Sequence, residues 1–291
     1  MGDRHLFCFG LGYSALALAR RAMADGWTVA GTCRETATRD TLRAEGIAAE
    51  LFDGGAPLAD AAARLGTASH ILSSVPPDDA GDPVLRHHDD DLAECAGAEW
   101  IGYLSTTGVY GDRGGDWVDE DSELRPTGDR GARRVTAEAG WRDLWWDHGR
   151  PIHFFRLAGI YGPGRSALET VKGGAARRIH KAGQVFSRIH VDDIATVLLA
   201  SMARPNPGAV YNHCDDDPAA PDEVIAYACE LLGQEPPPLV PYHQAEAEMS
   251  AMARSFYRDN KRVRNNRIKD ELGITLAYPD YKTGLKALLE T

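Results

Sequence analysis

Residues 5–15 read HLFCFGLGYSA, an apolar run followed by a glycine-rich turn and the start of a longer amphipathic segment. His5–Phe9 has the unbroken apolar character of a buried strand. Tyr13–Asp25 repeats its apolar side chains at helical spacing and is followed by a glycine that would stop a helix. A strand, a tight turn and a helix are therefore predicted within the first 25 residues.

The turn in this stretch fits the pattern G-x-G-x-x-G/A, with alanine in the third place. In this pattern the first glycine permits the tight turn, and the second lets the backbone approach a pyrophosphate. The small third residue allows close packing of helix and strand. Free N–H groups at the helix N-terminus attract phosphate. The sequence therefore predicts a dinucleotide site with these contact residues: Gly10, Gly12, Tyr13, Ser14 and Ala15.

Short apolar runs and longer amphipathic ones continue to alternate as far as residue 157. Further strands are predicted at Trp27–Cys33, Ile47–Phe52, His70–Val75, Trp100–Ser105 and Ile152–Leu157. Helices are predicted at Thr38–Glu45, Ala56–Leu65, Asp82–Cys95 and Ala132–His148. Repeated β-α-β units with almost continuously apolar strands predict an α/β fold with a doubly wound parallel sheet of the Rossmann type.

The last third of the chain is punctuated by glycine and proline and reads as a smaller α+β substrate lobe. Its predicted helices are Pro221–Gly233 and Tyr278–Leu289, and the acidic tract Asp215–Pro218 is predicted to be a solvated loop. We expect residues 1–160 to form the NAD(P)-binding domain and residues 161–291 to form mainly the lobe. Residues 184–215 are expected to fold back onto the first domain.

Acidic residues outnumber basic ones by 43 to 32, which gives a formal charge of −11. This balance opposes a nucleic-acid or anionic-membrane partner, so a small-molecule partner is expected. Five scattered cysteines without a CxxC pair indicate reduced thiols, and the N-terminus lacks a secretory pattern; both favour the cytoplasm. His87 and Asp91 would make only half of a metal site, so no metal is predicted.

The end of the second predicted strand bears on which dinucleotide binds. Arg34 lies 24 residues after Gly10, where a guanidinium suits the 2′-phosphate of NADP. Arg39 is a second candidate for that role. Glu35 follows directly and could instead hold the ribose of NAD, and Arg34 could be a plain solvated charge. The sequence favours NADP over NAD.

The chain resembles the extended short-chain dehydrogenase/reductases, in the NAD(P)-dependent epimerase/dehydratase group, and most of all the atypical members with a GxGYS turn. Five landmarks occur in the family's order: the turn at 10–15, Asp53, STTGVYG at 105–111, RLAGIYGPGR at 156–165 and RIHVDDI at 188–194. The resemblance implies a cleft between a Rossmann domain and a substrate lobe. It also implies that Asp53 receives the adenine amino group, that Pro163 and Gly164 lead into the lobe, and that these residues lie beside the cofactor: Ser73, Ser74 and Val75.

The catalytic positions depart from that family. Its members use a Ser or Thr together with the pair Tyr-x-x-x-Lys, and Thr106 stands at the Ser/Thr position. Counting back from Glu138, which matches the acid that commonly follows the pair, places Arg134 at the lysine and Arg130 at the tyrosine. Arginine cannot replace the tyrosine, because its pKa is far too high for it to donate a proton.

Three interpretations of these positions stay open. Another residue could supply the proton in an oxidoreductase or epimerase; the candidates are Tyr110, Tyr161 and Asp119. Arg130 and Arg134 could bind a small substrate that is anionic or linked to a nucleotide, because guanidinium groups suit carboxylate or phosphate. The protein could also be catalytically silent and act as a sensor or carrier of NADP(H).

The plainest alternative for the arginines is a solvated helix face. Arg130, Arg133 and Arg134 would then pair with acids such as Asp129 and Glu138. A second basic run, residues 260–267, could likewise be solvated or could steer an anionic substrate toward the cleft.

Two further patterns concern architecture. Trp141 and Trp145 share one face of the long predicted helix, a spacing typical of packing rather than ligand stacking. By resemblance this helix joins a four-helix dimer interface, so a homodimer is expected. Asp192 or Asp193 is predicted to cap the N-terminus of a helix that returns to the Rossmann domain.

Overall fold

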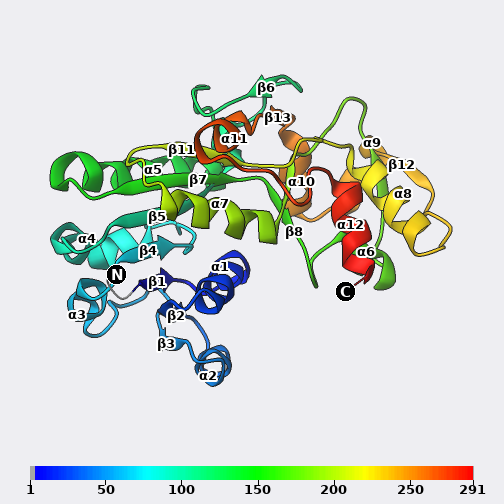
Figure 1. Cartoon of the computed structure of the whole chain (residues 1–291). Helices are drawn as coiled ribbons and strands as arrows, with labels where there is room; N and C mark the ends of the chain where they lie inside the picture. Colours follow the sequence, from blue (N-terminus) through cyan, green and yellow to red (C-terminus); the bar gives the residue numbers. More distant parts are fainter. Residues whose placement is uncertain (1–3, 291) are drawn as a thin grey trace.

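The apolar runs of the sequence form one seven-stranded parallel sheet in the computed structural model, which describes residues 4–290 (Figure 1). The strand order is β11-β7-β5-β4-β1-β2-β3, and every neighbouring pair is parallel. The strands are β1 (His5–Phe9), β2 (Thr28–Cys33), β3 (Ala48–Leu51), β4 (His70–Ser73), β5 (Trp100–Thr106), β7 (Ile152–Leu157) and β11 (Val210–His213). This order confirms the predicted doubly wound sheet.

Helices cover both faces of the sheet, as parallel strands with apolar side chains on both sides require. One face carries α1 (Tyr13–Ala24), α2 (Thr36–Ala44), α7 (Val191–Ala203) and α11 (Asn266–Leu272). The other carries α3 (Ala61–Gly66), α4 (Pro83–Glu94) and α5 (Asp129–His148). Each group of helices shares a buried apolar cluster with the strands. No helix between residues 4 and 290 is long and apolar enough to cross a membrane.

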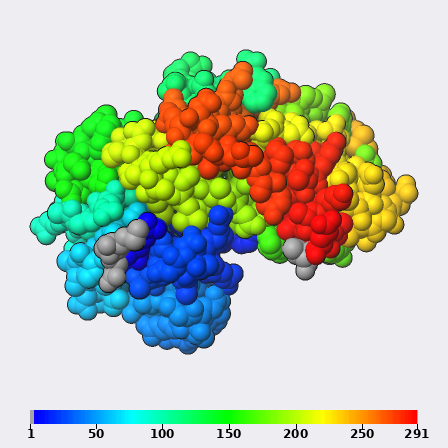
Figure 2. All heavy atoms as spheres, viewed as in Figure 1, coloured from blue at the N-terminus to red at the C-terminus, as the bar shows by residue number. Residues whose placement is uncertain are grey.

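The remaining elements build a lobe at one end of the sheet (Figure 1), which Figure 2 shows in the same view with all heavy atoms. One apolar cluster joins Tyr161 to helices α6 (Ala167–Lys172), α8 (Pro221–Leu231) and α12 (Tyr281–Glu290). A second cluster joins β9 (Arg178–His180), β12 (Leu239–Pro241), α9 (Tyr242–Ala245) and α10 (Ala251–Arg258). The smaller elements are η1 (Thr107–Tyr110), β6 (Trp117–Val118), β8 (Gly159–Tyr161), β10 (Arg188–His190), η2 (Glu246–Glu248) and β13 (Arg262–Val263).

The chain passes back and forth between sheet and lobe. After the lobe segment around β9, β10 pairs with β8, α7 packs on α1, and β11 becomes an edge strand of the large sheet. Arg21 of α1 donates to the carbonyl oxygen of Asp192 at 3.1 Å and to Thr196 Oγ1 at 2.6 Å. Residues 191–213 therefore belong to the layers of the sheet, although they follow part of the lobe in the sequence.

The predicted helix at Ala56–Leu65 begins five residues late, at Ala61. Asp60 precedes it with a left-handed backbone, at φ 55°, which an α-helix does not continue through. The loop before it is held by α4: the N–H of Leu58 donates to Nε2 of His88 at 3.0 Å. Tertiary contacts thus set this boundary. No group of three or more side chains that could hold a metal ion occurs in residues 4–290.

Two predictions about acidic residues were wrong. Of the tract 215–218, expected to be a solvated loop, Asp215 is only 1% exposed and its N–H donates to the carbonyl oxygen of Arg188 at 2.7 Å, whereas Asp216 and Asp217 are exposed. Helix α7 is capped by His190, whose Nδ1 accepts the N–H of Asp192, rather than by either aspartate. The carboxylate of Asp193 instead accepts two backbone N–H groups, at 2.9 and 3.0 Å, from residues 277 and 278.

Candidate functional site

The glycine-rich turn is held between two strands of the sheet. Gly10 has a left-handed φ of +80°, and a Cβ there would meet Ser74 Oγ at 3.0 Å and Val75 Cγ2 at 3.2 Å. Its N–H donates to Thr32 Oγ1 at 2.9 Å, and the N–H of Leu11 donates to the Thr32 carbonyl at 2.6 Å. Glycine is thus required at this position by backbone conformation and by close packing.

The N-terminus of α1 opens directly from this turn. Gly12 stands at the cap position without a side-chain cap, and a Cβ there would meet nothing within 4 Å. The first turn of α1 carries no acidic residue. Ser14 and Ala15 are buried behind it. Uncapped N–H groups facing open space, at the positive end of a helix dipole, are suited to a phosphate group.

The end of β4 lies against the same turn. Ser74 Oγ donates to the carbonyl oxygen of Gly10, and Val75 is half-buried beside it. Ser73 is fully buried, yet its Oγ has no hydrogen-bond partner among the described residues. An unpaired buried hydroxyl is unfavourable, so this oxygen has the capacity for a further hydrogen bond.

The predicted adenosine-side residues follow the neighbouring strands β2 and β3, whose ends are paired in register. Arg34 and Asp53 are both exposed there. Arg34 makes no ion pair or hydrogen bond within the part of the chain described, whereas Arg39 is paired with Asp40 at 2.8 Å. Glu35 occupies the N-cap position of α2 without a hydrogen bond from its side chain to the helix. Of the two arginines, Arg34 is therefore the one with a free guanidinium.

The first three arginines of α5, Arg130, Arg133 and Arg134, have separate environments. Nη1 of Arg134 donates to the hydroxyl of Tyr103 at 3.0 Å and to the carbonyl of Leu104 at 2.5 Å, and its guanidinium lies over the Tyr103 ring. Arg133 pairs with Asp79 at 2.5 Å. Arg130 is exposed and has no partner in residues 4–290. Only Arg130 is therefore free to meet an anion without giving up an existing contact.

Glu138 does not pair with this arginine cluster, which corrects the predicted solvated face. Its carboxylate is buried and accepts from Nε and Nη2 of Arg156, at 3.1 and 2.7 Å. Ser105 Oγ donates to the same carboxylate at 2.5 Å. Burial lowers the pKa of Arg156, but the bonds to Glu138 outweigh it, so the pKa lies above its ordinary value.

Two of the candidate proton donors lie inside the protein. The hydroxyl of Tyr110 donates to Asn212 Oδ1 at 2.7 Å and accepts from Arg156 at 3.0 Å; burial raises the pKa of Tyr110 to about 12. Tyr161 is 7% exposed, its hydroxyl points to the carbonyl of Asp280, and burial together with nearby aspartates raises its pKa. Their positions therefore give no support to either phenol as the proton donor.

The remaining candidates lie nearer the surface. Thr106 ends β5 and is partly exposed; its Oγ1 accepts the N–H of Gly108 at 3.1 Å. Asp119 directly follows β6, where its carboxylate accepts from Ser122 at 2.8 Å. Thr106 keeps a hydroxyl at the carboxyl edge of the sheet, the edge where open α/β sheets bind ligands.

Sequence reasoning missed the polar network inside the protein. It runs from Ser105 and Glu138 through Arg156 and Tyr110 to Asn212, and every member is less than 9% exposed. One signal was present: Arg156 is a lone charge in the otherwise apolar strand IHFFRL. A charge in a buried strand requires a buried partner.

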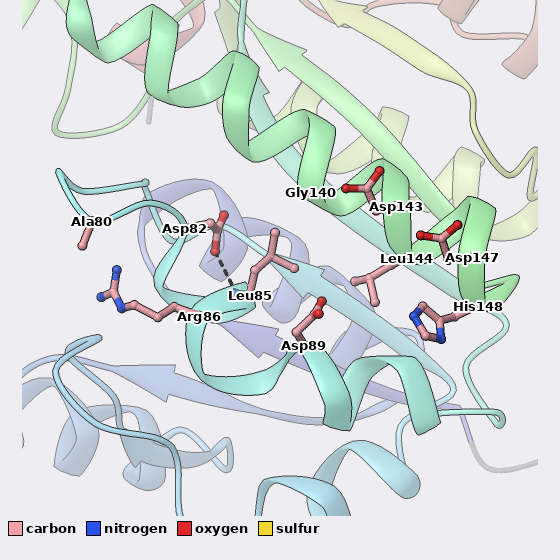
Figure 3. A pocket seen from close by; sticks show the side chains of 10 residues that line it. All are labelled: Ala80, Asp82, Leu85, Arg86, Asp89, Gly140, Asp143, Leu144, Asp147 and His148. Carbon is pink, nitrogen blue, oxygen red and sulfur yellow. Dashed lines mark hydrogen bonds between the residues drawn. The ribbon is translucent and has the colours of Figure 1, made fainter.

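A separate hollow lies between α4 and α5 (Figure 3). It has a volume of about 460 Å³, and its lining includes Asp89, Asp143, Asp147 and His148. None of the residues of the glycine-rich turn lines it. The hollow is therefore a feature of the helix layer and not part of the turn site.

Comparisons with known proteins agree with this geometry. No family model matches the sequence. A solved structure from Methylobacillus flagellatus, provisionally described as an NAD-dependent epimerase/dehydratase, is 25% identical to this chain in sequence. It covers 100% of this chain and 98% of its own, with a TM-score of 0.75. Protein YeeZ of Escherichia coli K12 is 28% identical over 284 residues, which are 93% of this chain and 95% of YeeZ. The chain has the Rossmann-type fold of the epimerase/dehydratase branch of the short-chain dehydrogenase/reductases.

Another solved structure is much more similar to this chain. A conserved protein of unknown function from Silicibacter pomeroyi DSS is 51% identical and has a TM-score of 0.90. The match covers 99% of this chain and 98% of that protein. The chain belongs to the same family as this Silicibacter protein.

Proposed function

We propose that the protein binds a nicotinamide dinucleotide at the turn of residues 10–15 and acts as an oxidoreductase or epimerase. The observation that carries this proposal is the uncapped N-terminus of α1, which opens into free space beside the left-handed Gly10. The hydroxyl of Ser74, which donates to the Gly10 carbonyl oxygen, adds a polar group at the same place. The residues present therefore fit a dinucleotide.

In this proposal the N–H groups after Gly12 hold the pyrophosphate, and Asp53 accepts from the adenine amino group. Ser73, Ser74 and Val75 line the site at the end of β4. The free guanidinium of Arg34 would pair with a 2′-phosphate, so NADP is the proposed dinucleotide rather than NAD. When bound, the nicotinamide ring accepts or donates a hydride.

The proposed substrate is small and anionic or linked to a nucleotide. Arg130 begins α5, is exposed and has no partner within residues 4–290, so its guanidinium is available to a carboxylate or phosphate. Thr106 supplies a hydroxyl that can hold a substrate oxygen. Arg134 would serve differently: its bonds to residues 103 and 104 make it a positioning residue at the start of α5.

A second function, an NADP(H)-binding sensor without catalysis, is favoured by one specific observation. The helix that carries the proton-transferring tyrosine in the family has arginines at both positions, and Tyr110 and Tyr161 are buried. None of these groups presents an accessible hydroxyl to a substrate.

Binding and turnover tests separate these functions. We expect NADPH to bind the purified protein, measured by calorimetry, more tightly than NADH does. The complex is then mixed with aldehydes, ketones and nucleotide sugars while absorbance at the nicotinamide band is followed, and the nucleotide sugars are also checked for epimerised product. Turnover supports the enzyme, and tight binding without turnover supports the sensor. Absence of binding by both dinucleotides would overturn both functions.

We further propose that the protein is a homodimer that pairs α4 and α5 of two copies. Trp146 of α5 is 64% exposed, which leaves a large apolar side chain uncovered in one copy. The free, buried cysteines suit a reducing compartment, so a cytoplasmic location is proposed.

A further inference from the structure

The glycine-rich turn is connected to the lobe by one side chain. Tyr13, the first residue of α1, donates its hydroxyl to the carbonyl oxygen of Pro163 at 3.0 Å. Gly162 lies against the same hydroxyl, since a Cβ there would approach it to 2.6 Å. In Figure 1 the segment that follows β8 reaches down beside α1. The residue directly after Gly12 therefore contacts the segment through which the chain enters the lobe.

That segment ends in an arginine placed over the same tyrosine. The guanidinium carbon of Arg165 lies 5.6 Å from the centre of the Tyr13 ring. The backbone of Arg165 forms two hydrogen bonds with Gly162, each 3.0 Å long, so the base of its side chain is fixed. The side chain is exposed and makes no ion pair within the described residues. Its guanidinium is therefore unpaired and lies close to the N-terminus of α1, where the carboxylates of Asp192 and Glu169 also act on the Tyr13 hydroxyl.

The turn itself supplies no cation. Residues 10–15 contain neither lysine nor arginine. Two arginines of α1 are already engaged: Arg20 pairs with Glu45 at 3.0 Å, and Arg21 binds Asp192 and Thr196. In a chain with a formal charge of −11, an anion at the turn would gain most from a nearby unpaired guanidinium.

We propose that Arg165 is a cationic arm that the lobe contributes to the pyrophosphate of the bound dinucleotide, with Tyr13 holding it in place. This inference rests on the proposed dinucleotide site. A guanidinium binds phosphate oxygens through paired, charge-assisted hydrogen bonds, and the long arginine side chain can rotate from the tyrosine ring toward the helix end. The dinucleotide would then contact the turn and the lobe together.

The test compares ligands that have and lack the pyrophosphate. Calorimetry gives the Kd of NADPH, ADP-ribose and adenosine 2′-monophosphate for the wild type and for Arg165→Ala. We expect the variant to bind NADPH and ADP-ribose about tenfold more weakly, a factor equal to about 1.4 kcal/mol. Its NADPH affinity should also depend less on salt. Adenosine 2′-monophosphate should bind equally to both proteins, because it carries no pyrophosphate.

Three controls separate the possible causes. Lys172→Ala removes an exposed positive charge from α6 of the same lobe and should leave every Kd unchanged. Arg165→Lys keeps the charge and should recover part of the affinity. Tyr13→Phe keeps the ring and removes the bond to Pro163, so we expect a loss smaller than that of Arg165→Ala. Thermal unfolding of each variant verifies that it is folded.

The outcomes distinguish the inference from the proposed function. If the wild type binds NADPH and Arg165→Ala binds it equally well, the arm is disproved while the dinucleotide site stands. An equal loss of affinity for adenosine 2′-monophosphate would also disprove the arm. Arg165 would then act through the overall electrostatic potential of the protein and not through contact with the pyrophosphate. If the wild type binds neither NADPH nor NADH, the site and the arm both fall.

Discussion

Arg156 and Glu138 form a two-bond ion pair inside the protein, with side chains 3% and 2% exposed and N···O distances of 3.1 and 2.7 Å. The pair joins β7, the strand next to the edge strand β11, to α5, the helix that carries Arg130 and Arg134. Through Ser105 and Tyr110 it also reaches the end of β5 and the end of η1. The pair therefore fixes the elements on which Thr106 and the α5 arginines lie.

Breaking this pair should destabilise the protein strongly. Glu138→Leu leaves the Arg156 guanidinium buried without its carboxylate, which typically costs about 3–5 kcal/mol of unfolding free energy. Urea unfolding followed by circular dichroism measures this loss. Because the double variant Glu138→Leu/Arg156→Met removes both charges, it should recover most of the stability. The exposed pair Arg125–Glu123 provides the matched control, and Glu123→Leu should change little. Equal stability of Glu138→Leu and wild type would contradict this account.

The sequence predicts the fold well because the relevant signals are local. Apolar runs, helical spacing and the glycine turn each lie within a few neighbouring residues, and the strand order follows from right-handed crossovers. The predictions that failed depend on contacts between residues far apart in the sequence. Asp215 is buried because the chain near Arg188 lies over it, and the charge of Arg188 opposes the rise in the pKa of Asp215 that burial causes. No spacing in the sequence reveals that contact.

In the candidate site, too, features set by neighbouring residues were predictable and contacts between distant residues were not. The turn at Gly10 is recognisable because its conformation dictates its residues. The environment of Arg134 cannot be recognised from the sequence, because its partners, Tyr103 and Leu104, lie about thirty residues away on β5. Likewise, the contact between Tyr13 and Pro163 spans 150 positions. Side chains that meet across elements become visible only when the elements are packed together.

Two buried histidines should make stability depend on pH. Burial lowers the pKa of His153 to about 4 and of His213 to about 3. The unfolded chain takes up these protons near pH 6.5 while the native state stays neutral, so stability is complete above pH 6.5 and falls as the pH drops toward 4. Urea midpoints measured between pH 7 and pH 4 test this expectation.

His213→Phe isolates one of the two histidines. Neither ring nitrogen of His213 has a partner in residues 4–290, and the ring contacts Phe155 edge-on, so an apolar ring suits the position. The variant should lose part of the stability decrease below pH 6.5. His243→Phe, at an exposed position, is the control and should leave the pH dependence unchanged. Identical pH profiles for His213→Phe and wild type would refute the role of His213.

Oligomeric state tests the proposed pairing of α4 and α5. At micromolar concentration, light scattering after gel filtration should give twice the monomer mass of 31.6 kDa. Trp146→Glu places a charge on the exposed face of α5 and should shift the protein toward monomer. Trp117→Glu changes an equally large exposed side chain on β6, outside α4 and α5, and should leave the dimer intact. A wild-type mass of 31.6 kDa would disprove the dimer.

Dinucleotide preference should depend on Arg34. Removing its guanidinium in Arg34→Ala takes away the proposed partner of the 2′-phosphate, so the Kd of NADPH should rise about tenfold while that of NADH barely changes. Arg39→Ala is the control, since Arg39 is already paired with Asp40. Equal Kd values of NADPH and NADH for the wild type would count against the NADP assignment.

Gly12→Ala separates the fold of the turn from its function. In the protein alone a Cβ at residue 12 meets nothing within 4 Å, and the position has an ordinary negative φ, so stability should be unchanged. The same methyl group would occupy the space through which a pyrophosphate approaches the backbone, so NADPH affinity should fall at least about tenfold. Gly10→Ala provides the contrast: it should destabilise the fold itself, because Gly10 has a φ of +80° and close neighbours on β4. If Gly12→Ala binds NADPH as tightly as the wild type does, the pyrophosphate does not bind at this turn.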